Sequence, residues 1–443
     1  MTKIFNFSVN KYLIQTFFYT LSTLVANISN FILAIVFIYA LAPEEYSKVV
    51  LLKASLIMIT SLMSLGISQG VVRWVAKEVS KNNLLSSIIF FISIQSIIST
   101  LIYIGVILSL KQVLNIDISI LLVLTIFILN LSMMLNNELL NWSRANQQSQ
   151  QFSIYTFLRS LLQITSVVVF LGLYSNFISY LFGIAIAEFL LLFLLAFSLR
   201  KEFSFTYSKS LIFSILKYSW PHALIISSGF VLNYIDRFML SKLQNDVSVI
   251  AYYDAASMLL LAIFSLASRP FNLFIFPAYT NKHKIDGVNK TIKFIEESQK
   301  YFVLILILLL TLTSFFSSFL LNLFFPENYI VASRIVPILS FGLLFNSLYV
   351  SAMAGLYISD KTNLIALASI IGIFVNIISN YLLIPTYGMT GAAVGTTLGF
   401  SASFIVGYLF AIRFLYIRLP FLLILLGFLV LSFALIDLSI FKP

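Results

Sequence analysis

The sequence lacks cysteine and is poor in charge. Its 443 residues include no Cys, two His and three Trp, and 10% are charged, against about 25% in soluble domains. Without cysteine the chain has no disulfide, thiolate metal site or cysteine nucleophile. The two histidines, His222 and His283, do not form a metal cluster by themselves. We therefore expect no metal and no cofactor.

Apolar residues dominate instead. They make up 60% of the chain, and the mean hydropathy is +1.02. About 20 apolar residues in a helix cross a membrane core of about 30 Å. We predict an all-α integral membrane protein with twelve spans, at approximately 12–41, 48–72, 84–110, 117–138, 152–174, 176–199, 212–241, 248–279, 301–325, 331–358, 363–386 and 390–417. A further apolar run at 419–441 is either a thirteenth span or a helix along the bundle.

The net charge is +11, and the distribution of the positive residues indicates how the chain is oriented in the membrane. If the N-terminus is cytoplasmic, 18 of the 27 Lys and Arg fall in inner joints and six in outer joints. This bias is the positive-inside pattern, so we expect contact with anionic lipid and no nucleic acid. Two longer basic joints, 200–217 and 281–300, are predicted to lie inside. The second is predicted to form an amphipathic helix at the membrane surface, with one apolar face made of Ile285, Val288, Ile292 and Ile295.

Six spans, a basic joint and six more spans suggest a duplicated unit. We predict an N-terminal half at 1–209, a C-terminal half at 210–418 and an extra hydrophobic segment at 419–443. An offset of 204 residues aligns Leu65-Gly66 with Arg269-Pro270, which predicts a helix break at the same depth in both halves. Transporters with repeated halves bind their substrate between them.

Eight charged residues lie at predicted membrane depth. Burying a charge there is unfavourable, so each is a candidate for function. The candidates for a substrate-binding cavity are the cations Arg269, Arg159, Arg237, Lys53 and Arg73, and those for a gate or ion coupling are Asp236, Asp254 and Glu188.

Each candidate also has a purely structural explanation. Arg269 lies too deep to reach the outer surface, so it either lines a cavity, forms an internal salt bridge or caps a carbonyl at the break expected before Pro270. Arg159 and Lys53 could reach the membrane surface along their stems, and Arg73 could anchor the inner end of its span. Arg237 could pair with Asp254, and Asp236 with Lys53. Glu188 is the one acidic residue expected near mid-membrane, either as a coupling site or as a paired structural carboxyl.

The most specific string is NYLLIPTYGMTGAA, residues 380–393. Pro385 and Gly388 predict a tight outer turn, and Gly391, Ala392 and Gly395 predict close helix packing. The string resembles the turn signature of the polysaccharide transporters, which are the O-antigen and capsule lipid-linked oligosaccharide flippases of the multidrug/oligosaccharidyl-lipid/polysaccharide exporter superfamily. LGISQGVVRWVAKE (65–78), YIDRFML (234–240) and the stretch 251–280 resemble the same family.

The resemblance implies two six-helix bundles forming a V around a central cavity. The cargo would be an oligosaccharide repeat unit on undecaprenyl diphosphate, carried across the bacterial inner membrane by alternating access. A proton or sodium ion for coupling, a polysaccharide polymerase and a chain-length regulator are the further expected partners. The related lipid II flippases carry an arginine within their first helix. The first predicted span of this chain instead contains Asn27 and Asn30, and no charged residue follows Lys11 within that span.

Two alternatives remain. A multidrug cation antiporter of the same superfamily would favour acidic residues in its cavity, whereas the residues at membrane depth comprise five bases and three acids. A polytopic polymerase or ligase acting on the same lipid-linked sugars would be an enzyme. It would need a nucleophile and base at usable spacing, and the sequence shows no such pair.

Overall fold

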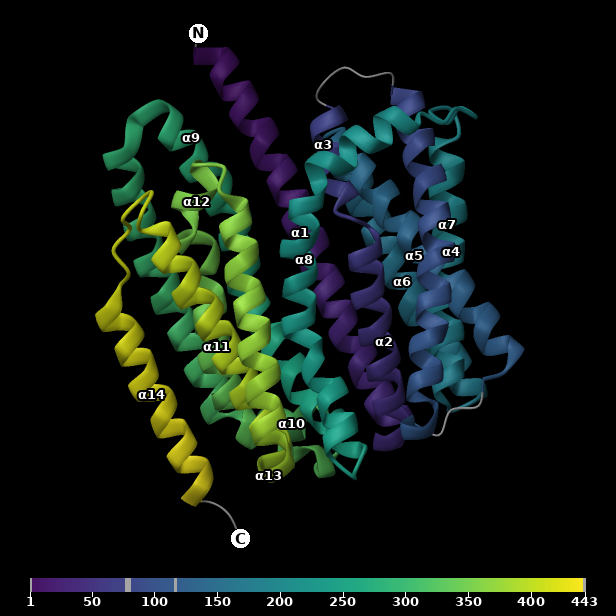
Figure 1. Cartoon of the computed structure of the whole chain (residues 1–443), viewed down its shortest axis with the longest axis vertical. Helices are drawn as coiled ribbons and strands as arrows, with labels where there is room; N and C mark the ends of the chain where they lie inside the picture. Colours follow the sequence, from purple (N-terminus) through teal and green to yellow (C-terminus); the bar gives the residue numbers. More distant parts are fainter. Residues whose placement is uncertain (1, 76–80, 115–117, 441–443) are drawn as a thin grey trace. The chain divides into compact units, whose positions relative to one another are not determined.

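The computed structural model describes residues 2–75, 81–114 and 118–440, and every regular element within these ranges is a helix. Eleven helices of this part of the chain are long and apolar enough to cross a membrane. The prediction of an all-helical, multi-pass membrane protein is therefore confirmed. The chain divides into two units, Met1–Ser227 and Ser228–Pro443 (Figure 1). This boundary falls inside α8 (Lys209–Leu243), rather than in the joint before that helix.

Unit 1 contains seven helices and the first part of α8. They are α1 (Thr2–Ala40), α2 (Pro43–Met63), α3 (Ile67–Val75), α4 (Lys81–Leu114), α5 (Ile120–Ala145), α6 (Ser149–Leu173) and α7 (Phe177–Leu199). Helix α6 packs against α1 and α7, while α5 packs against α4 and α7. Buried apolar side chains of α3, α4, α5, α7 and α8 form one core.

Local sequence explains where these helices begin. Helix α2 starts with Pro43, whose fixed φ suits a first helical position, followed by two glutamates beside the positive end of the helix dipole. The Ser119 side chain accepts a hydrogen bond from the backbone N–H of Leu122 and caps α5. Asn176 caps α7 in the same way through Ser179. Each cap satisfies an N–H that has no partner within the helix.

The second predicted span is broken near its C-terminal end. Leu65 and Gly66 both have positive φ, 48° and 67°, and they separate α2 from α3. A Cβ on Gly66 would lie 2.7 Å from the backbone oxygen of Ser219, so only glycine fits. The matching break predicted at Arg269-Pro270 is not found, because α9 (Ser248–Phe315) continues through both residues. The proposed repeat therefore does not extend to this detail.

Unit 2 contains the remainder of α8 and the later helices. They are α9, α10 (Ser317–Phe324), η1 (Glu327–Ile335), α11 (Val336–Ala352), α12 (Ala354–Ile358), α13 (Thr362–Ala411) and α14 (Phe421–Ile440). Helix α11 packs against α9 and α13. Helix α14, the predicted extra segment, packs along α9 and α11, where Phe428 stacks on Phe341.

Helix α13 contains the eleventh predicted span and most of the twelfth. Its backbone leaves the helical region at Gly388, where φ is 55° and ψ is −129°. Beyond this point the chain returns along the preceding arm. Cβ atoms built on Gly391, Gly395 and Gly399 would lie within 3 Å of Leu383, Asn380 and Asn376, respectively. The predicted tight turn and small-residue packing are both confirmed.

The second basic joint differs from its prediction. Helix α9 passes through it and turns at Gly287, where φ is 78°. Ile285 and Val288, on either side of this turn, are exposed, but Ile295 is fully buried in a core with Ile275 and Tyr279. The prediction of a single apolar face from Ile285 to Ile295 is therefore wrong. The turn at Gly287 separates the two ends of that stretch, and its later residues pack inside the protein.

Candidate functional site

Unit 1 contains a cavity of about 280 Å³ among its long apolar helices. Helices α1, α2, α5, α6 and α7 line it. Three predicted site residues, Lys53, Arg159 and Glu188, meet in its wall, together with polar side chains that include Asn30, Thr156, Ser160, Gln163 and Tyr180. The lining therefore carries two cations, one carboxylate, amides and hydroxyls. Such a surface suits an anionic, hydroxyl-rich ligand.

Glu188 is the best-paired group of this cavity. It is fully buried, and its Oε1 accepts hydrogen bonds from Arg159 Nε and Gln163 Nε2, each at 2.7 Å. Asn136 Nδ2 donates to Oε2 at 2.8 Å. Arg159 and Gln163 are four residues apart, which places them on one face of α6. These contacts correspond to the paired structural carboxyl that we considered for Glu188.

The Arg159 guanidinium also makes contacts other than the one with Glu188. Its Nη1 donates to Asn137 Oδ1 at 2.8 Å, and its side chain is 20% exposed, against 1% for Glu188. The ion pair therefore has a buried acidic end and a partly open basic end. Lys53, on α2, is half-buried and faces the same cavity.

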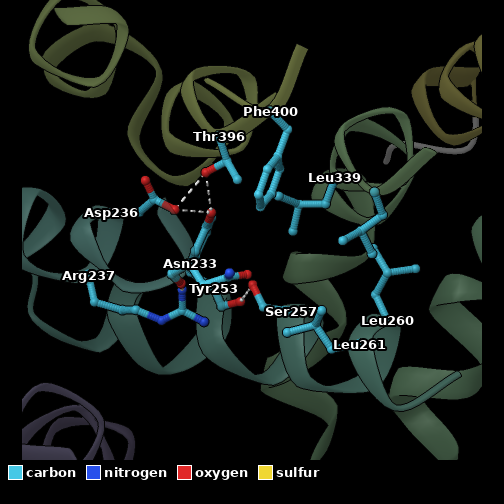
Figure 2. Close-up of a pocket in the computed structure, with 11 residues that line it drawn as sticks. Asn233, Asp236, Arg237, Tyr253, Ser257, Leu260, Leu261, Leu339, Thr396 and Phe400 are labelled. Atoms are coloured by element: carbon cyan, nitrogen blue, oxygen red, sulfur yellow. Dashed lines mark hydrogen bonds between the residues drawn. The ribbon is translucent and has the colours of Figure 1, made fainter. Parts of the chain in front are cut away.

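Unit 2 contains a second polar cluster, centred on Asp236 (Figure 2). Asp236 is fully buried. Its Oδ2 accepts hydrogen bonds from the Thr396 hydroxyl at 2.6 Å and the Tyr253 hydroxyl at 2.9 Å. Its Oδ1 accepts from Nδ2 of Asn380 at 2.7 Å and of Asn376 at 3.2 Å. Four uncharged donors from α9 and α13 thus surround one carboxylate.

The neighbouring residue, Arg237, is committed to a different partner. Its Nη2 and Nε lie 2.9 Å and 3.1 Å from Asp254 Oδ1, and its Nη1 donates to the backbone oxygen of Asn233. Arg237 and Asp254 are both almost completely buried. The pairing that we considered for these two residues is therefore present. Asp236 and Arg237 point to different partners because adjacent helical positions are about 100° apart.

A small cavity of about 30 Å³ lies against the Asp236 cluster, lined by residues that include Asn233, Asp236, Tyr253, Ser257 and Thr396 (Figure 2). This volume holds one water molecule or one small ion. Within the described residues, the buried Oδ1 of Asn380 has no hydrogen-bond partner. The lining thus combines one carboxylate, the Asn233 amide and hydroxyls with the guanidinium of Arg237, whereas Asn380 lies outside the lining.

The last two predicted cations lie outside both clusters. Arg73 is exposed on α3, with its guanidinium 4.2 Å from the centre of the Tyr218 ring. Arg269 is exposed on α9, and within the described part of the chain it makes no hydrogen bond or ion pair. The internal salt bridge considered for Arg269 is thus not formed with any described residue.

Several polar residues of these clusters were not predicted as site residues. Tyr253 and Thr396 hold Asp236, and Asn136 holds Glu188. A second buried acid, Glu138, lies in α5 and is 6% exposed, so Glu188 is not alone as a buried carboxyl in unit 1. A spacing of four residues between polar side chains in an apolar span, as in Asn376/Asn380, was the signal that could have found part of this set.

Comparison with known proteins finds sequence similarity over part of the chain and similarity of fold over almost all of it. A family model described as "Polysaccharide biosynthesis protein" matches residues 13–283. An uncharacterized membrane protein of Methanocaldococcus jannaschii is 27% identical over 198 residues, which are 44% of this chain. The match spans only 38% of that relative.

Solved structures of similar fold cover almost the entire chain. An inward closed lipid II flippase, MurJ, superposes with a TM-score of 0.72 at 16% identity, covering 96% of this chain and 93% of the flippase. An inward-facing multidrug resistance MATE family transporter gives a TM-score of 0.64 at 17% identity, covering 89% and 94%. A Pyrococcus furiosus transporter of the MOP superfamily, reported with a binding pocket of reverse polarity, also has a TM-score of 0.64, at 15% identity and covering 90% of this chain and 95% of that one. At these identities the likeness concerns the fold.

Proposed function

This chain belongs to the polysaccharide biosynthesis protein family, and we propose that it is a flippase for lipid-linked oligosaccharides. The cargo is an O-antigen or capsule repeat unit on undecaprenyl diphosphate. It moves from the inner to the outer leaflet of the bacterial inner membrane by alternating access. A polysaccharide polymerase would use the delivered units, and a chain-length regulator would act with it.

The observation that carries this proposal is the lining of the unit 1 cavity. Lys53 and Arg159 outnumber Glu188 there, and amides and hydroxyls supply most of the other polar contacts. A diphosphate or a sugar hydroxyl taken into hydrocarbon would lose its hydrogen bonds to water, at several kcal/mol for each group. Cationic and polar side chains replace those bonds. We propose that Lys53 and Arg159 contact the diphosphate or the first sugars, with Arg269 as a further phosphate contact.

The same lining weighs against a multidrug cation antiporter, because a cationic drug needs unpaired acidic groups. Glu188 is already bonded to Arg159, Gln163 and Asn136. The short joints weigh against a polymerase or ligase. Among the described residues, the joints 41–42, 146–148 and 174–176 leave no room for an extramembrane catalytic domain.

We further propose that the Asp236 cluster binds the coupling ion, a sodium ion or a proton. Carboxylate, amide and hydroxyl oxygens are the ligands that a hard cation prefers. The adjoining cavity fits one small ion, and the polar residues that line it include Asp236, Asn233, Tyr253, Ser257 and Thr396. Asp236 is joined directly to both arms of α13 through Asn380 and Thr396. Loading or emptying this site would therefore alter contacts between α8 and both arms.

The test measures transport of a purified lipid-linked repeat unit into proteoliposomes that contain equal amounts of each variant. We expect Lys53→Gln to lower transport at least tenfold. The matched control is Lys48→Gln on the same helix, because Lys48 pairs with Glu45 outside the cavity. Equal loss in both variants, or none in Lys53→Gln, would contradict the proposed cavity. Asp236→Asn should remove the dependence of transport on a sodium or proton gradient.

A further inference from the structure

Glu138 and Asn141 hold the first turn of α3 against α5. The Ser68 hydroxyl donates to Glu138 Oε1 at 2.5 Å, and Asn141 Nδ2 donates to the backbone oxygen of Ser68 at 2.9 Å. Glu138 and Asn141 are three residues apart on α5, so their side chains leave the same helical face. One residue of α3 is thus bound through both its side chain and its backbone.

The environment of Glu138 is unfavourable for a negative charge. The residue lies within the apolar helix Ile120–Ala145 and is 6% exposed. Its Oε2 is buried and has no hydrogen-bond partner among the described residues. Within the same part of the chain Glu138 makes no ion pair, since Arg144, the cation that acts on it electrostatically, donates to Asn141 Oδ1 instead. A proton on Oε2 would remove the uncompensated charge.

Helix α3 packs closely against α8 and so links the Glu138 site to that helix. A Cβ on Gly70 would lie 2.4 Å from Cγ2 of Ile215, and one on Gly66 would lie 2.7 Å from the backbone oxygen of Ser219. Close contact at both glycines fixes α3 against the first part of α8. That helix begins in unit 1 and ends in unit 2, where it carries Asp236. A displacement of α3 therefore cannot leave α8 unaffected.

We propose that Glu138 is a proton-binding site that controls the seating of α3 on α5. A proton taken from water forms an O–H bond at Oε2, while Oε1 continues to accept from Ser68. The neutral carboxyl is compatible with its apolar surroundings, so α3 stays seated. When the proton returns to water, the carboxylate draws water into the site, and α3 separates from α5.

Other titratable and charged groups face this region and need controls. They are Arg144 on α5, Arg73 on α3, and Tyr218 and His222 on α8. Of these, His222 is the group whose ordinary pKa lies nearest neutral pH. Glu202 is a second carboxylate beside α5, and its Oε2 accepts from Trp142 Nε1 at 2.9 Å.

The absence of natural cysteine makes the seating of α3 measurable. Val71 is 1% exposed and packs in the core of unit 1, whereas its neighbour Val72 is 40% exposed. We would label Val71→Cys and Val72→Cys separately with N-ethylmaleimide in proteoliposomes, from mildly acidic to mildly alkaline pH. Dividing the labelling rate of Val71→Cys by that of Val72→Cys removes the intrinsic pH dependence of thiol reactivity. The ratio of the two labelling rates therefore measures how often α3 separates from α5.

We expect the ratio to rise with pH, by up to about tenfold per pH unit, the limit for one linked proton. Glu138→Gln, which mimics the protonated form, should keep the ratio low at every pH. Glu202→Gln and His222→Gln should behave like the natural chain. A ratio that does not change with pH, or that changes equally in Glu138→Gln, would overturn the proposal. If Glu138→Gln fails to fold, Ser68→Ala serves as the second variant and should weaken the seating at acidic pH. Labelling requires no transport, so its outcome is independent of the proposed flippase activity.

Discussion

Asn380 and Gly395 face each other across the two arms of α13, and a Cβ on Gly395 would lie 2.0 Å from Asn380 Oδ1. The same asparagine donates through Nδ2 to Asp236. The absence of a side chain at Gly395 therefore gives the Asn380 amide the space that it needs to reach the carboxylate. Gly395, which has no side chain, thus determines the geometry of the proposed ion site.

Gly395→Ala should separate ion coupling from folding. The added methyl group displaces the Asn380 amide and removes its hydrogen bond to Asp236, at about 1–3 kcal/mol of stability. We expect folded protein in the membrane with a markedly weaker dependence of transport on the ion gradient. Gly229→Ala in α8 is the control, because no atom lies within 4 Å of a Cβ there. Unchanged ion dependence in Gly395→Ala would argue against an ion site at Asp236.

The buried pair of Arg237 and Asp254 should matter for stability more than for transport. Asp254→Asn leaves a buried guanidinium without its counterion, which lowers stability by about 3–5 kcal/mol. Thermal unfolding in detergent should show this loss. The double variant Arg237→Met/Asp254→Leu removes both charges, and we expect it to recover most of the stability. If Asp254→Asn unfolded like the natural chain, the pair would have no structural role.

The ion pair in unit 1 should respond unequally to loss of its two ends. Arg159→Ala leaves Glu188, which is 1% exposed, without a cation, whereas Glu188→Gln leaves Arg159, which is 20% exposed. We therefore expect Arg159→Ala to unfold at the lower temperature. Glu188→Gln also makes the cavity more positive, so the apparent affinity for a polyprenyl diphosphate should rise. Equal unfolding temperatures would contradict the exposure argument.

The helical architecture could be predicted because hydropathy and helix length depend on local sequence. The turn at Gly388 and the packing of Gly391 and Gly395 were also predictable from the motif. The pairing of the charges was less predictable, because each pair joins two helices. Arg237 on α8 and Asp254 on α9 are 17 residues apart, and Arg159 on α6 and Glu188 on α7 are 29 residues apart. The break at Leu65-Gly66 was matched to Arg269-Pro270, where none occurs. Proline within a membrane helix can be accommodated by its neighbours, so its position alone does not predict a break.

Arg269 provides the sharpest test of phosphate binding. It is exposed and makes no hydrogen bond or ion pair with any described residue, so removing it leaves no buried carboxylate unpaired. We expect Arg269→Ala to insert and fold normally while surface polysaccharide per molecule of membrane-inserted protein falls at least tenfold. Arg269→Lys keeps the charge but loses the planar fork that binds phosphate through two hydrogen bonds, so it should restore transport only in part. Normal polysaccharide output per molecule for the alanine variant would show that Arg269 does not bind the cargo. Complete rescue by lysine would reduce its role to that of a positive charge.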